Sequence, residues 1–326
     1  MARGVPPGAL GVVPARFAAD GVQPMAGSFE PEGDGVRFVP RFPFVDGEVY
    51  ALLVEGVVVG TIERPGVVGE ATTEVVGIHP SGDEVPLNLL RIYVHFSAPM
   101  SEGWAARAVQ MLRGDTGEVL VRTFLHMEPE LWDRGHRRLT VFLDPGRIKR
   151  GLVPHEEGGY PLVAGESVVL RVGVEFRDAA GRELRSGAVH RYRVGDAVRA
   201  RVEPGAWGVR APAVGSREPL VVELERPLDH ALLGRCVWVE DGAGARVAGR
   251  VVVGEGERSW GFVPERPWGD SAMWVVVDSA LEDVAGNSVV RVFDRDLRRR
   301  GDDPRNVRRL RFEFACTARR DKNSEG

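Results

Sequence analysis

The chain has 326 residues, of which 43% are hydrophobic and 28% charged, and its formal net charge is −4. This length predicts two to three domains, and the composition is that of a globular protein and excludes a disordered one. The negative charge argues against nucleic acid as a partner, because such binding depends on neutralising phosphates. No membrane insertion is expected, since the sequence lacks a run of about 18 apolar residues.

Short segments rich in β-branched and aromatic residues, each bounded by turn residues, predict β-strands along the whole chain. In chain order they are 36–40, 49–63, 89–96, 139–143, 167–176, 219–225, 236–241, 273–278 and 309–314. Glu102–Leu112 is the one helical candidate, and we expect it to begin as a single turn and to end as a strand. Many turns between short strands would account for the 41 glycines and 22 prolines. The predicted fold class is all-β.

The sequence also repeats internally. Phe96–Met100 (FSAPM) follows a predicted strand as Leu224–Leu228 (LERPL) does, and Phe176–Gly181 corresponds to Leu281–Gly286. The repeat predicts two copies of one unit, residues 72–196 (the middle module) and residues 197–315 (the last module), with Phe142 and Phe262 at comparable core positions. Residues 316–326 are expected to form a disordered tail.

A third, partial copy is predicted at the N-terminus. Phe38 precedes Tyr50 by 12 residues, as Phe262 precedes Trp274, and Gly27 and Gly249 stand at similar distances upstream. Residues 1–66 (the N-terminal segment) therefore match the second half of a module. Half a sandwich leaves an edge and an apolar face uncovered, so we expect this segment to dock on its neighbour.

These motifs resemble those of a known family. A strand followed by FSAPM, and later a turn of the form D-x-x-G-N/R, is similar to the bacterial Ig-like domains of S-layer proteins. The longer set with ELWD (130–133), DPGRIKRG (144–151) and LEDVAGN (281–287) resembles a group of uncharacterised bacterial Ig-like proteins. The resemblance implies tandem immunoglobulin-like β-sandwich domains and no particular activity. Members of that group are usually secreted, whereas this sequence as given starts without an apolar signal segment, which predicts a cytoplasmic protein.

The two cysteines, Cys236 and Cys316, both fall in the C-terminal third. They allow either one disulfide or two unpaired thiols.

The middle module differs from the last by two expanded connections, 126–138 and 144–166. Long connections in compact domains are unusual unless they are functional or disordered, and binding sites of sandwich folds lie on loops. We expect the strands of the middle module at 91–96, 108–112, 119–125, 139–143, 167–174 and 189–194. Successive connections of an antiparallel sandwich alternate between its ends, so we expect the two loops to lie at opposite ends.

The first loop carries His126, Glu128, Glu130, Trp132, Asp133 and His136, with Asp178 nearby. Histidines and carboxylates could bind a divalent cation, but no known ligand spacing is present, and we assign no metal and no cofactor. Trp132 beside Glu130 could stack on a sugar, or it could plug the open end of the sandwich. Glu130 and Trp132 are the candidate ligand-binding residues of this loop.

The second loop carries Arg147, Lys149, Arg150 and His155. Three cations within four residues could clamp a carboxylate or phosphate, and His155 beside Glu156 could act in acid–base chemistry. The alternative is a surface charge cluster in which these cations pair with Asp144 and the neighbouring glutamates. His95, within a predicted strand, is interpreted as a sheet-face residue and not as a ligand.

No nucleophile elbow, phosphate loop or dinucleotide fingerprint is present. The sequence predicts a non-enzymatic interaction or structural protein whose middle-module loops bind a protein, a glycan or a small anionic ligand. An enzyme or small-molecule binder with its site on the same loops is the alternative.

Overall fold

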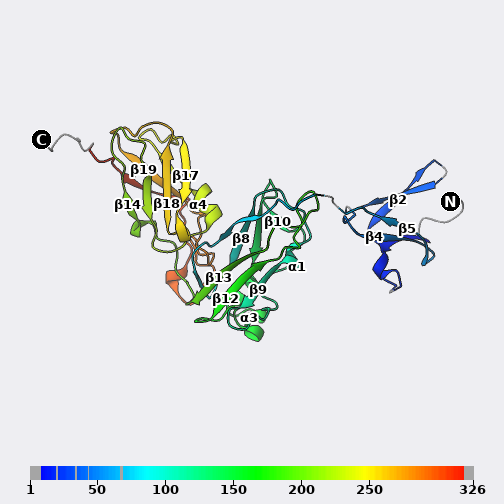
Figure 1. Ribbon diagram of the computed structural model, residues 1–326. Coiled ribbons are helices and arrows are strands. Elements are labelled where there is room, and N and C mark those ends of the chain that lie inside the picture. The colour runs from blue at the N-terminus through cyan, green and yellow to red at the C-terminus, as the bar shows by residue number, and fades with distance from the viewer. Residues whose placement is uncertain (1–8, 20, 34, 43, 67–68, 319–326) are drawn as a thin grey trace.

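The computed structural model describes residues 9–318 apart from 20, 34, 43 and 67–68, and it shows an all-β chain (Figure 1). Its helices are short: α1 (Ala105–Ala108), α2 (Pro145–Ile148), α3 (Val153–Gly158) and α4 (His230–Cys236), with 3-10 turns at η2 (Ala15–Phe17), η3 (Pro204–Ala206), η4 (Glu255–Glu257) and η5 (Arg300–Asp302). In the described part of the chain, no helix has the length and apolar character needed to cross a membrane. The part of the predicted tail from residue 319 onward lies outside the described residues.

The middle module is a sandwich of two four-stranded sheets. One sheet has the order β10-β11-β8-β6 and the other β7-β13-β12-β9. The strands are β6 (Val75–His79), β7 (Glu84–Pro86), β8 (Arg91–Phe96), β9 (Val109–Arg113), β10 (Leu131–Trp132), β11 (Arg138–Phe142), β12 (Ser167–Val172) and β13 (Ala188–Gly195). Pairing is antiparallel except between β7 and β13. In the immunoglobulin lettering, these sheets are A-B-E-D and C-F-G, with β7 added beside G.

The last module repeats this strand order. Its sheets are β14-β15-β18-β17 and β16-β19-β20, which are again A-B-E-D and C-F-G. The strands are β14 (Gly208–Arg210), β15 (Leu220–Glu223), β16 (Val237–Glu240), β17 (Gly249–Val253), β18 (Ser259–Pro264), β19 (Met273–Asp278) and β20 (Arg309–Phe314). The predicted tandem immunoglobulin-like sandwiches are confirmed.

Alternating apolar residues supply each core. On β8, Ile92, Val94 and Phe96 are buried in the same cluster as Val168 and Leu170 of β12. Because successive side chains of a strand point to opposite faces, this spacing places one apolar face of each sheet against the other. A separate cluster in the last module is centred on Trp260, Phe262 and Trp268.

Glu102–Leu112 does contain one helical turn, α1, followed directly by β9. The expected strand at 119–125 is wrong: only isolated bridges form at Val119 and Phe124, since Arg122 between them has a positive φ of 58°. Cys236 and Cys316 are both unpaired thiols.

Phe142 and Phe262, expected at comparable core positions, both lie on E strands. Phe262 is buried beside Leu220, while Phe142 is half-buried beside Arg91, whose guanidinium lies 5.8 Å from the ring centroid. Phe142 alternates with the core residues Leu139 and Val141, so its side chain points to the other face of the sheet, and the expected equivalence of the two phenylalanines is wrong.

The N-terminal segment contains the sheet β1-β4-β5 and the hairpin β2-β3. Its strands are β1 (Leu10–Pro14), β2 (Gly27–Glu32), β3 (Gly35–Pro40), β4 (Val49–Val54) and β5 (Val57–Glu63). Gly27 pairs with Pro40 as Gly249 pairs with Pro264 in the last module. A Cβ atom on either glycine would clash with a phenylalanine ring of the neighbouring strand. This shared arrangement supports the proposal that residues 1–66 correspond to strands C to G of a module.

The aromatic residues of this segment pack on one another. The ring centroids of Phe44 and Tyr50 are 4.5 Å apart, and those of Phe38 and Phe44 are 6.2 Å apart. Among the described residues, the side-chain hydrogen bonds of 9–66 also close within the segment. The segment stands to one side of the middle module (Figure 1), so the expected docking is not seen. The physical reason is that Tyr50 is buried by its own segment.

Candidate functional site

The first expanded loop closes one end of the middle module. The indole nitrogen of Trp132 donates to Glu130 (2.9 Å), and the other carboxylate oxygen of Glu130 accepts from the backbone of Ala105 at the start of α1 (2.7 Å). The Trp132 ring packs against Phe96 and Phe176. Glu130 and Trp132, the predicted ligand-binding residues, therefore form these hydrogen bonds and ring contacts within the protein. The Trp132 ring fills the end of the sandwich.

The second expanded loop lies at the other end and is folded around Arg147. The Arg147 guanidinium donates to the carbonyls of Gly158 (2.8 Å), Gly159 (3.0 Å), Tyr160 (2.7 Å) and Arg122 (3.1 Å). The Nδ1 atom of His155 is hydrogen-bonded to the Arg147 carbonyl. The side chain of Asp144 caps α2 instead of pairing with these cations.

Lys149 and Arg150 reach the last module. The Nζ atom of Lys149 lies 4.4 Å from the ring centroid of Phe293. Arg150 Nε lies 2.6 Å from Oδ2 of Asp294, a buried carboxylate that Arg199 Nε also contacts at 3.0 Å. The three predicted cations and His155 thus each already have a partner within the chain.

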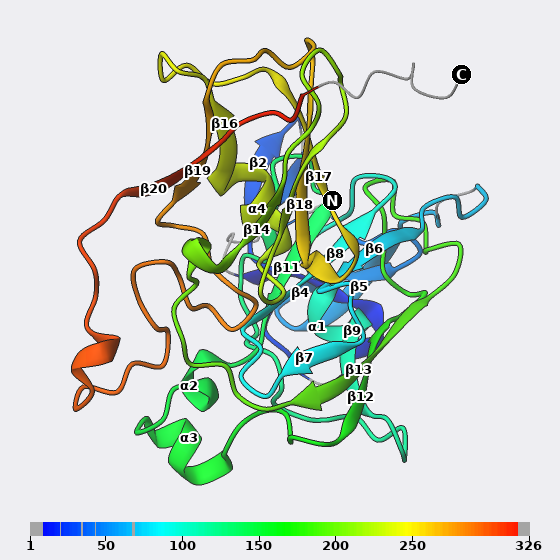
Figure 2. The same cartoon turned by 90° about the vertical axis from the view of Figure 1, so that its left-hand side faces the viewer.

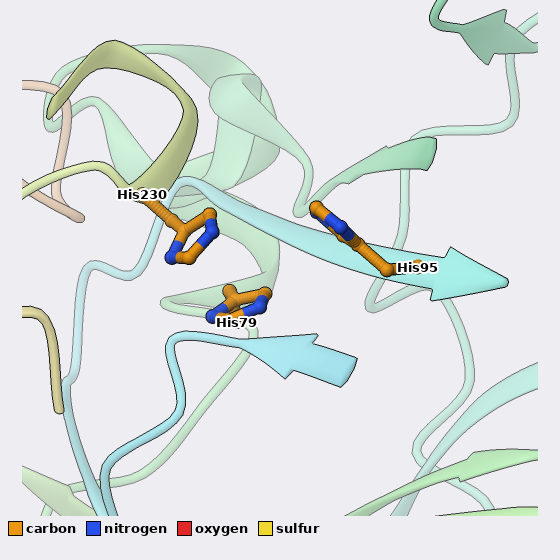
Figure 3. A group of neighbouring side chains, drawn as sticks. All are labelled: His79, His95 and His230. Carbon is orange, nitrogen blue, oxygen red and sulfur yellow. The ribbon is translucent and has the colours of Figure 1, made fainter. Parts of the chain in front are cut away.

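Sequence reasoning missed a polar cluster where the middle and last modules meet. It consists of His79 at the end of β6, His95 on β8 and His230 at the start of α4, together with the side chain of Glu257 in η4. Figure 3 shows the three imidazoles brought together from these elements. The rings of His79 and His230 are stacked with centroids 3.5 Å apart, and the His95 ring lies 5.0 and 5.5 Å from them.

Glu257 is the hub of this cluster, and its side chain is 1% exposed. Its Oε1 atom lies 2.7 Å from Nδ1 of His79 and 3.3 Å from Nδ1 of His230, and Oε2 accepts from the backbone of Ser81 (2.7 Å). Burial alone would raise the pKa of Glu257, but these hydrogen bonds outweigh it and lower that pKa to about 2. The carboxylate is therefore ionised near neutral pH.

His95 is the least satisfied member. Its Nε2 atom is buried and has no hydrogen-bond partner. Burial, followed by the neighbouring His79 and His230, lowers the pKa of His95 to about 4, so its imidazole is neutral at pH 7. A neutral imidazole with a free ring nitrogen can accept a hydrogen bond or ligate a metal.

A second buried group lies beside the histidines. Asp229, the N-cap of α4, accepts from the Tyr93 hydroxyl (2.8 Å) and forms an ion pair with Nε of Arg91 (2.8 Å), which also pairs with Glu282. Arg91 and Tyr93 belong to β8, while Asp229 and Glu282 belong to the last module. A groove of about 450 Å³ opens next to this group, between β8, β11 and α4. The junction of the two modules therefore combines buried charged side chains with a groove that opens beside them.

Local signals for the cluster existed in the sequence. Gly77 pairs with His95 and His79 pairs with Tyr93, so His79 and His95 are diagonal neighbours on one sheet face. A strand prediction at 75–79 would have brought these two together. His230 and Glu257 belong to another module, and only the relative orientation of the two modules adds them.

Comparisons with known proteins show only distant structural similarity. No family model and no curated protein matches the chain. It is similar to solved structures of native α2-macroglobulin from Escherichia coli, domains MG0-NIE-MG1 (9% identity, 75% of this chain and 71% of that chain, TM-score 0.26), and of tandem titin Ig domains (11%, 76% and 98%, TM-score 0.22). It is also similar to the S-layer protein SbsC (9%, 76% and 41%, TM-score 0.27). The chain's own strand order defines it as a tandem immunoglobulin-like β-sandwich protein.

Proposed function

We propose that this chain is a non-enzymatic structural or interaction protein in which the middle and last modules form one rigid unit, with a partner protein bound at the expanded loops of the middle module. The rigid unit is supported by the groups around Glu257, Asp229 and Asp294, each of which joins residues of both modules. In addition, Leu90 donates a backbone hydrogen bond to Val284 (2.9 Å), and Val284 is part of the middle module's core. Separating the modules would expose this apolar contact to water.

The observation that carries the partner proposal is a group of exposed apolar side chains at the second loop. Val121 is 75% exposed, Val153 63% and Leu152 44%. Arg147 ties the segment of Val121 to the end of α3 through the carbonyls of Arg122 and Gly158, so the three residues lie at the same end of the module. Apolar groups gathered at one end of a domain are typical of a protein-binding surface.

The chemistry of the loop favours a protein over a small anion. To bind an anion, the predicted set of Arg147, Lys149, Arg150 and His155 would have to leave the partners described above. One of those partners, Asp294, is a buried carboxylate. The exposed valines and leucine need no such rearrangement. A protein surface with an apolar centre fits them best.

Site-specific photo-crosslinking in extracts of the organism that makes this protein tests the proposal. A benzophenone amino acid replaces Val153 in one variant and Val121 in another, and the matched control carries it at Val252, an exposed residue of β17. We expect one discrete protein adduct at positions 153 and 121 and none at 252. Equal labelling at all three positions, or no adduct at 153 and 121, would overturn the partner proposal.

A further inference from the structure

We propose that His79, His95 and His230 together bind one divalent transition-metal ion, with Zn²⁺ as the first candidate, and that Glu257 positions two of these ligands. One ligand nitrogen from each histidine lies within 4.8 Å of the other two. Three imidazoles are a common ligand set for zinc, and the fourth position is then filled by water or another group. Figure 3 shows that the three side chains come from β6, β8 and α4 into one space.

Glu257 fixes the hydrogen positions of two ligands. Because its carboxylate can only accept, the Nδ1 atoms of His79 and His230 carry the protons that they donate to it. The Nε2 lone pairs of both rings are then free. A carboxylate that holds the far nitrogen of a ligating histidine is the usual outer contact of a metal site, because it fixes the tautomer and raises the basicity of the ligand.

Two further features indicate a ligand in this space. The buried Nε2 atom of His95 has no hydrogen-bond partner, which is costly unless something else satisfies it. Gly77 stands opposite His95, and a Cβ at Gly77 would lie 3.1 Å from Nε2 of His79 and 3.9 Å from Cβ of His95. The absence of a side chain at Gly77 keeps the space between these two ligands open.

Binding requires a small adjustment. An ion cannot lie in the planes of two stacked rings at once, so at least one of His79 and His230 must rotate about its Cβ–Cγ bond. Both side chains are partly exposed, at 16% and 24%, and this leaves room for the rotation.

The proposed ion would join the two modules. His79 and His95 belong to the middle module, while His230 and Glu257 belong to the last. A metal held by all three histidines therefore stabilises the junction, and unfolding of either module would release it. This inference goes beyond the partner proposal and does not depend on it.

Direct metal binding by the full untagged chain is the test. Protein stripped with EDTA and dialysed is titrated with Zn²⁺ by calorimetry and with Co²⁺ by visible absorption, which reports tetrahedral nitrogen ligation. We expect one equivalent to bind and a higher melting temperature with Zn²⁺. His230→Ala should remove the saturable binding, and Glu257→Gln should weaken it by about 10- to 100-fold.

Controls separate loss of ligation from loss of fold. His126→Ala alters an exposed histidine of the first loop and should bind one equivalent as the unaltered chain does. Circular dichroism in EDTA verifies that each variant is folded, and His95→Gln replaces His230→Ala if the latter is not. The inference is overturned if the unaltered chain binds no stoichiometric Zn²⁺, or if a folded His230→Ala or His95→Gln binds it with unchanged affinity.

Discussion

The Nδ1 atom of His79 lies 2.7 Å from the Oε1 atom of Glu257, although 178 residues separate them in the sequence. The contact depends on an unusual backbone, because Gly256 and Glu257 have φ values of 63° and 54°. This left-handed turn directs the carboxylate of the last module toward the end of β6 in the middle module. The histidine cluster is therefore a property of the junction and not of either module alone.

Asp229→Ala should be among the most damaging single changes in the last module. It would remove the carboxylate that accepts from Tyr93 and Leu232 and would leave the buried guanidinium of Arg91 with Glu282 alone. Loss of one partner from a buried charge group costs about 3 kcal/mol of unfolding free energy. Urea unfolding measures the loss. Asp270→Ala, at an exposed position, should change stability by less than about 0.5 kcal/mol, and equal effects of the two changes would contradict the network.

Arg147→Ala should destabilise the protein by roughly 2 kcal/mol, since four carbonyls of the second loop lose a charged donor. Arg147→Lys should restore little of this, because an ammonium group does not reproduce the planar fork of the guanidinium. Urea unfolding of both variants measures the effect. If Arg147→Ala is as stable as the unaltered chain, the guanidinium is free to bind an anion instead.

Gly249→Ala should destabilise the last module by about 1–3 kcal/mol, because the added Cβ would lie too close to the ring of Phe262 and the carbonyl of Val263. Gly234→Ala is the matched control. Gly234 is exposed in α4 with no atom within 4 Å of an added Cβ, so alanine there should be neutral or stabilising by up to about 1 kcal/mol. Melting temperatures of the two variants that shift in the same direction would argue against this packing.

Asp178 should give a defined pH dependence. Burial alone would raise its pKa, but hydrogen bonds from Arg182 and Thr73 outweigh it and hold the pKa of Asp178 below its ordinary value of 3.8. A carboxyl with a depressed folded pKa contributes stability above its unfolded pKa, and that contribution is lost as the pH falls through the folded pKa. Asp178→Asn should therefore cost about 1–3 kcal/mol at pH 7 and progressively less below about pH 4. A cost that stays constant down to about pH 2.5 would show that the charge of Asp178 does not matter.

Much of the fold was predictable from local patterns. The alternation in RIYVHF and the repeat of FSAPM as LERPL are enough to place the B strands and the tandem copies, because strand burial has a period of two. The matched positions of Gly27 and Gly249 correspond in the structure to the same pairing of glycine with proline in two hairpins. The strand expected at 119–125 is wrong because Arg122 has a positive φ, and its carbonyl accepts from Arg147 of the second loop, a contact that no local pattern shows.

The site was less predictable. Arg147, Lys149, Arg150 and His155 are close in the sequence, but the partners of Lys149 and Arg150 are Phe293 and Asp294 of the last module, which no local pattern indicates. His95 was interpreted as a sheet-face residue, and it does lie on a sheet. His230 comes close to it only because the last module packs against the middle one, and local sequence patterns do not show that packing.

The most direct test of the account is a distance measurement between the two modules. Cys236→Ala and Cys316→Ser remove the native thiols, and nitroxide labels at Val189→Cys on β13 and Val252→Cys on β17, both exposed, report the orientation by pulsed electron paramagnetic resonance. If the modules form one rigid unit, the label-to-label distances will form a single narrow distribution, and adding Asp229→Ala will broaden it. A broad distribution in the doubly labelled chain without Asp229→Ala would show that the modules move independently and would contradict the account.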